Sequence, residues 1–92
     1  MLIFIPMTVK FLDFWAPWCS PCKMMNPILE ELKKEWGDKV EVVEINVDEN
    51  PSEAQKYGVM SIPTYVIEKD GKEIGRKIGV TSKEELNKLA LS

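Results

Sequence analysis

The chain has 92 residues, 45% hydrophobic and 29% charged, with five Gly and six Pro. A chain of this length forms one small domain, so we predict a single domain over residues 1–92, and the composition excludes a disordered or fibrous protein. The net charge of −3 comes from 12 basic and 15 acidic residues. That balance lacks the basic surplus that nucleic acid or an anionic membrane surface demands, so neither is an expected partner.

The apolar stretch near the start is short. Residues 2–5 are apolar but Pro6 follows, whereas a membrane span needs about 18 or more apolar residues. Residues 1–7 also lack the basic region and small-residue cleavage site of a secretory signal. We therefore expect no transmembrane helix and a cytoplasmic protein, in which closely spaced cysteines are more often redox-active or metal-binding than structural.

A strand and a helix are predicted around the two cysteines. Residues 8–15 are rich in β-branched and aromatic side chains and contain few polar ones, as expected for a central strand covered on both faces. Apolar residues then recur with helical spacing as far as Trp36, and Gly37 follows, which predicts a helix over residues 19–36. Pro27 lies inside this helix and should kink it rather than end it.

A second strand and a short helix follow. Residues 40–47 alternate so that Val43, Ile45 and Val47 share one face, a strand pattern. The sequence Asn50-Pro51-Ser52-Glu53 combines an N-cap, a proline at the first helical position and an acidic third residue, which predicts a helix ending at Tyr57.

A hairpin and a last helix complete the chain. The predicted strands 64–67 and 74–78 flank Asp70-Gly71, a dipeptide typical of type I′ hairpin turns, so these strands should be antiparallel. Ser82 followed three residues later by Glu85 is a capping box, which opens a final helix.

Cys19 and Cys22 carry the chemistry. At this spacing they share one face of the first helical turn, where unpaired N–H groups and the helix dipole stabilise a thiolate at Cys19. We expect Cys19 to attack a foreign disulfide and Cys22, one turn deeper and less exposed, to displace the product. Pro21 stiffens the turn between them. The alternatives are a static bridge or half of a zinc site, but without His or a third Cys zinc could bind only between chains.

These residues resemble the thioredoxin family. The resemblance rests on Asp13-Phe14-Trp15-Ala16-Pro17-Trp18-Cys19-Ser20-Pro21-Cys22-Lys23, Pro27, Asn46-Val47-Asp48, Ile62-Pro63-Thr64, Asp70-Gly71 and Gly79. It implies a three-layer α/β/α fold and an enzyme that reduces protein disulfides by dithiol–disulfide exchange. It also implies no bound cofactor, electrons from NADPH through a separate thioredoxin reductase, and disulfide-containing target proteins as partners.

Asp13 is the third candidate catalytic residue. It lies among apolar residues, where burial would raise the pKa of its carboxyl group. The resemblance implies that it helps to move the proton of Cys22. Family members usually pair this aspartate with a lysine on the neighbouring strand, and here the matching residue is Glu44. Either Glu44 turns to water, which we favour, or the two carboxyl groups share a site and repel one another.

The resemblance also implies a substrate-binding surface. A cis peptide bond between Ile62 and Pro63 would lie beside the cysteines, expose the backbone of Ile62 to an extended peptide, and deny metal ions access to the thiols. Val80 would join an apolar rim around it. The substrate-binding residues expected on this surface are Trp18, Pro21, Met60, Ile62, Pro63 and Gly79.

The chain departs from the family in two places. Ser20 replaces the usual glycine between the cysteines and should tune the balance of dithiol and disulfide. Only seven residues precede the first predicted strand, so most of the family's first strand and helix are missing. We expect a reduced, four-stranded mixed sheet in the order 40–46, 8–15, 64–67, 74–78. Its uncovered edge strand would favour a weak homodimer.

Two questions stay open from the sequence. Residues 2–5 could extend the first strand, cap the core or dock on another chain. The fold could also serve a glutaredoxin-like or oxidising thiol exchanger, or a non-enzymatic adaptor that retains its thiols incidentally.

Overall fold

The computed structural model describes residues 9–91, so the alternatives for residues 2–5 lie outside the described part of the chain. Its elements follow in the order β1 (Val9–Trp15), α1 (Ser20–Trp36), the 3-10 helix η1 (Gly37–Lys39), β2 (Val40–Asn46), α2 (Pro51–Lys56), β3 (Thr64–Lys69), β4 (Lys72–Ile78) and α3 (Lys83–Leu91). Each predicted strand and helix is present, with ends that differ by one or two residues.

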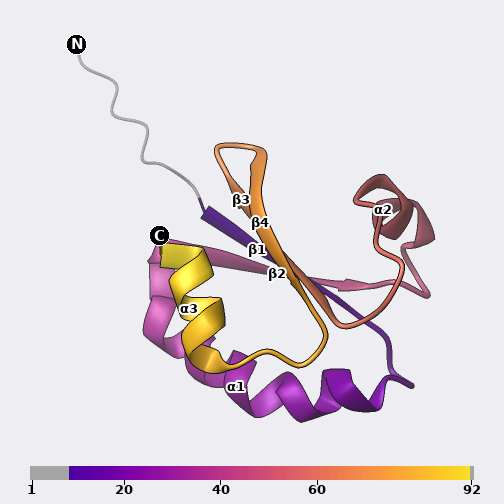
Figure 1. Ribbon diagram of the computed structural model, residues 1–92, viewed down its shortest axis with the longest axis horizontal. Coiled ribbons are helices and arrows are strands. Elements are labelled where there is room, and N and C mark those ends of the chain that lie inside the picture. Colours follow the sequence, from indigo (N-terminus) through magenta and orange to yellow (C-terminus); the bar gives the residue numbers. More distant parts are fainter. Residues whose placement is uncertain (1–8, 92) are drawn as a thin grey trace.

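The four strands form one mixed sheet in the order β2-β1-β3-β4. β1 runs parallel to β2 and antiparallel to β3, and β3 and β4 form an antiparallel hairpin. Helices α1 and α3 cover one face and α2 lies against the other (Figure 1). The predicted three-layer α/β/α fold with a four-stranded sheet is confirmed.

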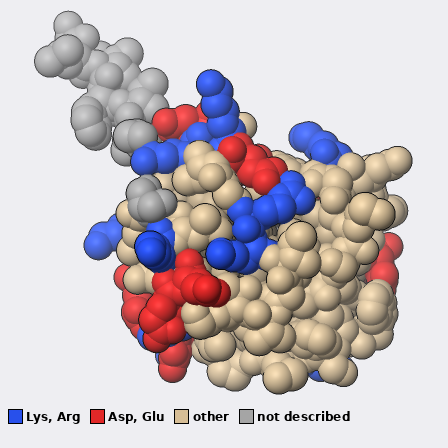
Figure 2. All heavy atoms as spheres, viewed as in Figure 1, with Lys and Arg blue, Asp and Glu red and all other residues tan. Residues whose placement is uncertain are grey.

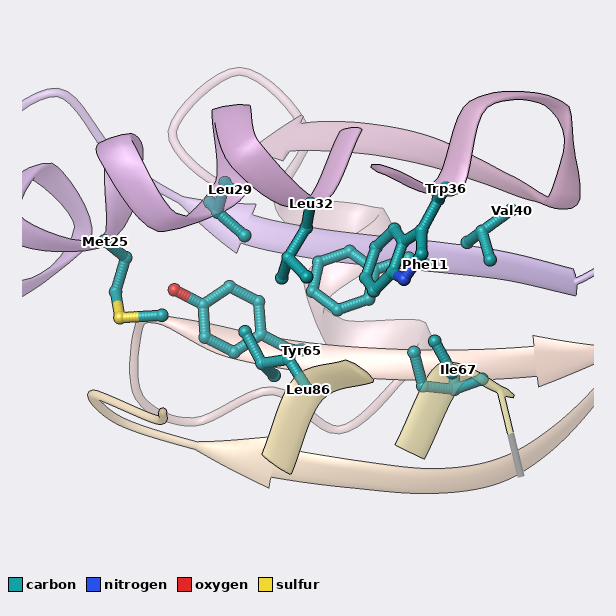
Figure 3. Close-up of a cluster of buried hydrophobic side chains, with 10 residues drawn as sticks. Phe11, Met25, Leu29, Leu32, Trp36, Val40, Tyr65, Ile67 and Leu86 are labelled. Carbon is teal, nitrogen blue, oxygen red and sulfur yellow. The ribbon is translucent and has the colours of Figure 1, made fainter. Parts of the chain in front are cut away.

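β1 is central because both of its faces are covered. Phe11 points into the larger core cluster, between α1 and α3, where its ring lies 5.1 Å from Trp36 and 5.4 Å from Tyr65 (centroid distances; Figure 3). Leu12 and Phe14 point to the α2 side. A fully buried side chain of this kind contributes about 2 kcal/mol through loss of contact with water. The two core clusters therefore hold β1 from both sides.

Helix α1 has the cysteines at its start and packs core residues against the sheet along the rest of its length. Its buried face presents Met25, Leu29, Leu32 and Trp36 to the sheet, as the helical spacing predicts. The helix continues through Pro27. Gly37 has φ +53°, and its N–H donates the closing α-helical hydrogen bond to the carbonyl of Lys33.

The three local signals lie where the sequence predicts them, but one lacks its side-chain hydrogen bond. Asp70 and Gly71 both have positive φ angles, as a type I′ turn requires, and Ser82 Oγ accepts a hydrogen bond from Glu85 N at 3.2 Å. Asn50, however, makes no capping bond to α2. Its side-chain amide instead donates to the carbonyl of Asn46 at 3.1 Å, so Asn50 holds the predicted N-cap position without the capping hydrogen bond.

Candidate functional site

Cys19 and Cys22 lie at the start of α1 and are joined by a disulfide bond. Their Cα atoms are 5.3 Å apart, a normal separation for bridged cysteines. Cys19 is the N-cap residue of the helix, and its Sγ accepts a hydrogen bond from Cys22 N at 3.2 Å. The backbone N–H of Cys22 in the first turn therefore points at this sulfur, and together with the helix dipole it would stabilise a thiolate there.

The two cysteines are buried to the same extent, with exposed fractions of 3% for Cys19 and 5% for Cys22. The expectation that Cys22 is the less exposed of the two is wrong for this disulfide form. Both residues pack with Ala16 in one cluster, against Val47 after β2 and Ile62 before β3. These distant segments cover both sulfurs together, which the helix alone would not do.

The loop before β3 lies against this cluster. The Ile62–Pro63 peptide bond is cis, as the resemblance implies, and Ile62 contacts the cysteine cluster. Pro63 is buried, and its carbonyl accepts a hydrogen bond from Gly79 N at 2.8 Å. The chain segments before β3 and after β4 are thereby tied together next to the disulfide.

Trp18, Met60 and Ile62 line one groove of about 300 Å³, together with Val47, Ala54, Val59 and Ser61. Trp18 is 66% exposed and Met60 98%. The indole N–H of Trp18 donates to Asp48 Oδ2 at 2.9 Å, which orients the ring. Asp48 is part of the family-like motif after β2, but we assigned it no role from sequence.

The other predicted substrate-binding residues lie outside the lining of that groove. Pro21 is exposed on the first turn of α1, Pro63 is buried, and Gly79 and the exposed Val80 follow β4. Figure 2 shows a broad area with few charged side chains at the lower right, where Figure 1 places the start of α1 and the loop between β4 and α3. An uncharged surface of this kind suits contact with other proteins.

Asp13 lies behind the disulfide and is 5% exposed. It lines a cavity of about 450 Å³ that is also lined by Cys22, Lys23, Glu30 and Glu44. The pKa of Asp13 is raised to about 7, chiefly by burial and further by the charge of Glu44, while the charge of Lys33 acts in the opposite direction. A carboxyl group with this pKa exchanges protons near neutral pH.

Both alternatives for Glu44 hold in part. Its side chain is 45% exposed and forms an ion pair with Lys33 of α1, so it is not buried with Asp13. It is nevertheless the direct neighbour of Asp13 in the β1–β2 register, and its charge raises the pKa of Asp13. The sequence analysis missed Lys33, whose only visible signal was its position three residues after Glu30 on one helical face.

Asp13 should make folding stability depend on pH. The folded-state pKa of Asp13 is raised from 3.8 to about 7. The neutral carboxyl group therefore costs no folding stability below pH 3.8, and its ionisation lowers the free energy of unfolding as the pH rises toward 7. The cost at pH 8 is on the order of 4 kcal/mol. Asp13→Asn, which cannot ionise, should therefore gain stability relative to the wild type by a similar amount between pH 4 and pH 8.

Urea unfolding of the oxidised protein at both pH values measures this difference. Asp38→Asn is the matched control, because Asp38 is exposed in η1, and its stability difference from wild type should stay constant. A difference for Asp13→Asn that is the same at pH 4 and pH 8 would show that the carboxyl ionises without penalty.

Together, a cysteine pair at a helix start, a cis-proline beside it and a buried carboxyl behind it define a thiol–disulfide exchange site on a three-layer α/β/α fold. The thioredoxin family model matches residues 6–92 of the chain. The thioredoxin of Bacillus subtilis is 56% identical over 81 residues, covering 88% of this chain and 78% of that protein. The thioredoxin of Staphylococcus epidermidis is 51% identical over 78 residues, covering 85% and 75%.

Solved structures agree with these relatives. The oxidised mitochondrial thioredoxin 3 of Saccharomyces cerevisiae superposes with a TM-score of 0.82 and 41% identity, covering 89% of this chain and 76% of that one. The chain belongs to the thioredoxin family. It is a thiol–disulfide oxidoreductase, because family members are protein-disulfide oxidoreductases and it carries their cysteine pair.

Residues 9–91 contain neither a membrane-spanning helix nor a cluster of metal-binding side chains. No helix in this part of the chain is both long enough and apolar enough to cross a membrane. Within the same residues, no group of three His, Cys, Asp or Glu side chains could hold a metal ion.

Proposed function

We propose that Cys19 is the nucleophile and Cys22 the resolving thiol of a protein-disulfide reductase. The Cys19 thiolate attacks one sulfur of a target disulfide, which forms a mixed disulfide and releases the first target thiolate. Cys22 then loses its proton and attacks Cys19 Sγ, which forms the internal disulfide and releases the second target thiolate. The observation that carries this assignment is the hydrogen bond from Cys22 N to Cys19 Sγ at the helix start.

Asp13 is the proton acceptor for Cys22 in this proposal. Both residues line the same cavity, and the pKa of Asp13, about 7, leaves a large share of molecules with a carboxylate at neutral pH. The proton that leaves the Cys22 thiol passes to this carboxylate and then to solvent.

Variants of the two cysteines test the assignment. Cys19→Ser should abolish insulin reduction in the presence of dithiothreitol, because the serine hydroxyl is not ionised at neutral pH. Cys22→Ser should instead accumulate a mixed disulfide between Cys19 and the target, visible by mass spectrometry. A wild-type rate for Cys19→Ser would contradict the reductase and leave only the function of a non-enzymatic adaptor. A mixed disulfide on Cys22 in the Cys19→Ser protein would show that Cys22 is the nucleophile and Cys19 the resolving thiol.

The target peptide docks across the cis-proline loop in this proposal. The backbone of Ile62 can pair with an extended segment in the manner of an added strand. Trp18, Met60 and Ile62 supply the apolar groove for its side chains, and Pro21, Pro63, Gly79 and Val80 complete the surface.

Ile62→Lys should raise the Michaelis constant for a protein disulfide several-fold, because it places a charge in the groove, while kcat changes little. Insulin reduction at varied insulin concentration measures both constants. Ile74→Lys is the matched control, since Ile74 is exposed on β4 and outside the groove. Equal Michaelis constants for wild type and Ile62→Lys would remove Ile62 from the docking surface.

The family also suggests an electron source and a cellular location for this protein. Thioredoxins normally use their own disulfide without a prosthetic group, together with a reductase and disulfide-containing targets. We propose NADPH as the electron source through a separate thioredoxin reductase, a cytoplasmic location, and a single domain over residues 1–92. The thioredoxin relatives favour this reductase role over a glutaredoxin-like or oxidising one.

A weak homodimer is the remaining part of the proposal. Within the described residues, β2 pairs with β1 on one side only, and a strand edge with free N–H and C=O groups favours pairing with another chain. Sedimentation equilibrium of the oxidised and reduced protein should give a mass that rises with concentration. A monomer mass in both redox states at high concentration would remove the dimer.

A further inference from the structure

A cluster of three charged side chains lies beside Asp13, and two of them line the same cavity. Lys33 Nζ forms ion pairs with Glu30, at 3.2 Å, and with Glu44. Glu30 and Lys33 come from α1 and Glu44 from β2, so the cluster spans two elements. Because Glu30 and Glu44 line the same cavity as Asp13 and Cys22, these charges lie next to the proton-exchange site.

Glu44 is a direct neighbour of Asp13 in the sheet. Asp13 and Glu44 are register partners of the parallel strands β1 and β2, and register partners project from the same face of a sheet. Two carboxyl groups so placed would repel each other if both were ionised. Lys33 is the cation that contacts Glu44 and approaches from the helix above the same face.

The groups that face Asp13 from the elements packed around it form a small set. α1 provides Cys22, Lys23, Glu30 and Lys33, β2 provides Glu44, and β3 provides Tyr65, the register partner of Asp13 on that side. Within residues 9–91, α3 contributes no charged residue to the cavity lining. Lys33 and Glu44 are the two ions whose charges act on Asp13, and they act in opposite directions.

We propose that the Lys33–Glu44 ion pair sets how readily Asp13 binds and releases a proton. In this proposal Glu44 favours the protonated acid and Lys33 favours the carboxylate. The inference rests on the proposed role of Asp13 as proton acceptor for Cys22. The family resemblance implies a lysine at the position of Glu44, which would place the cation on the sheet. Here it comes from α1 and acts across a glutamate, so a change in either partner alone would alter proton release from the cavity.

The alternative is that the pair only fastens α1 to β2. A fastening role predicts that loss of either partner has the same kind of effect, a small loss of stability, because both substitutions break the same ion pair. The proposal predicts opposite effects on Asp13. Lys33→Met removes the cation and leaves Glu44 unneutralised, whereas Glu44→Gln removes the repelling carboxylate.

The decisive measurement is an NMR titration of the Asp13 side-chain carboxyl carbon in the oxidised protein. The wild-type midpoint should lie at about 7. The midpoint should rise by roughly half a pH unit or more in Lys33→Met and fall by a similar amount in Glu44→Gln, the size expected for one nearby charge. The double variant should lie between the two. Midpoints that stay fixed, or that move in the same direction in both single variants, would overturn the proposal.

Lys83→Met is the matched control. Lys83 forms ion pairs with Glu31 and Glu35 of α1 but does not line the cavity. The Lys83→Met substitution removes a lysine and breaks a contact to the same helix. Because Lys83 lies outside the cavity lining, the Asp13 midpoint should stay at the wild-type value. A shift as large as that of Lys33→Met would mean that any loosening of α1 moves the titration, which overturns the specific role of the pair.

A kinetic readout separates this proposal from the function on which it rests. Single-turnover oxidation of the reduced protein by insulin, followed by tryptophan fluorescence, should slow about five-fold at pH 7 if the Asp13 midpoint rises by one pH unit, because the carboxylate fraction falls by that factor. The pH profile should move with the midpoint in each variant. If the Asp13 midpoints move as expected but the pH profile of the rate does not change, the result would support the role of the Lys33–Glu44 pair and exclude Asp13 as the proton acceptor.

Discussion

The candidate site is built on one hydrogen bond at the start of α1, from Cys22 N to Cys19 Sγ. The first N–H groups of any helix lack partners within the helix and need an acceptor. Here that acceptor is a cysteine sulfur, so the contact that begins the helix is also the contact that favours a negative charge on the sulfur. Helix formation and thiol reactivity therefore share one atom.

The central strand β1 places the rest of the site around that atom. Its end leads directly into the loop where Cys19 N donates to the Ala16 carbonyl at 3.1 Å, and Trp15 O accepts from Val47 N at 2.9 Å. The second bond brings the segment after β2 next to the cysteines. Because both faces of β1 are packed, the loop that precedes Cys19 starts from a fixed position.

Signals confined to a few neighbouring residues could be predicted from the sequence, as Asp70-Gly71 and Ser82 illustrate. The equal burial of Cys19 and Cys22 could not, because their cover comes from segments far along the chain. The same holds for the pairing of Lys33 with Glu44, which depends on how α1 is rotated about its axis as it packs on β2. The cis bond at Pro63 was predictable only through the family resemblance, since an isolated proline before a strand indicates a turn.

The buried carboxyl of Asp13 explains why the site needs charges of both signs around its cavity. A fully solvated aspartate has a pKa near 4 and is a weak base toward a thiol. A buried one with only Glu44 beside it would hold its proton through neutral pH, because desolvation and repulsion act in the same direction. Lys33 opposes both effects. The pKa of about 7 is thus the balance of a core that excludes water and an ion pair at its edge, and the folding penalty of Asp13 is the counterpart of its proposed use as a base.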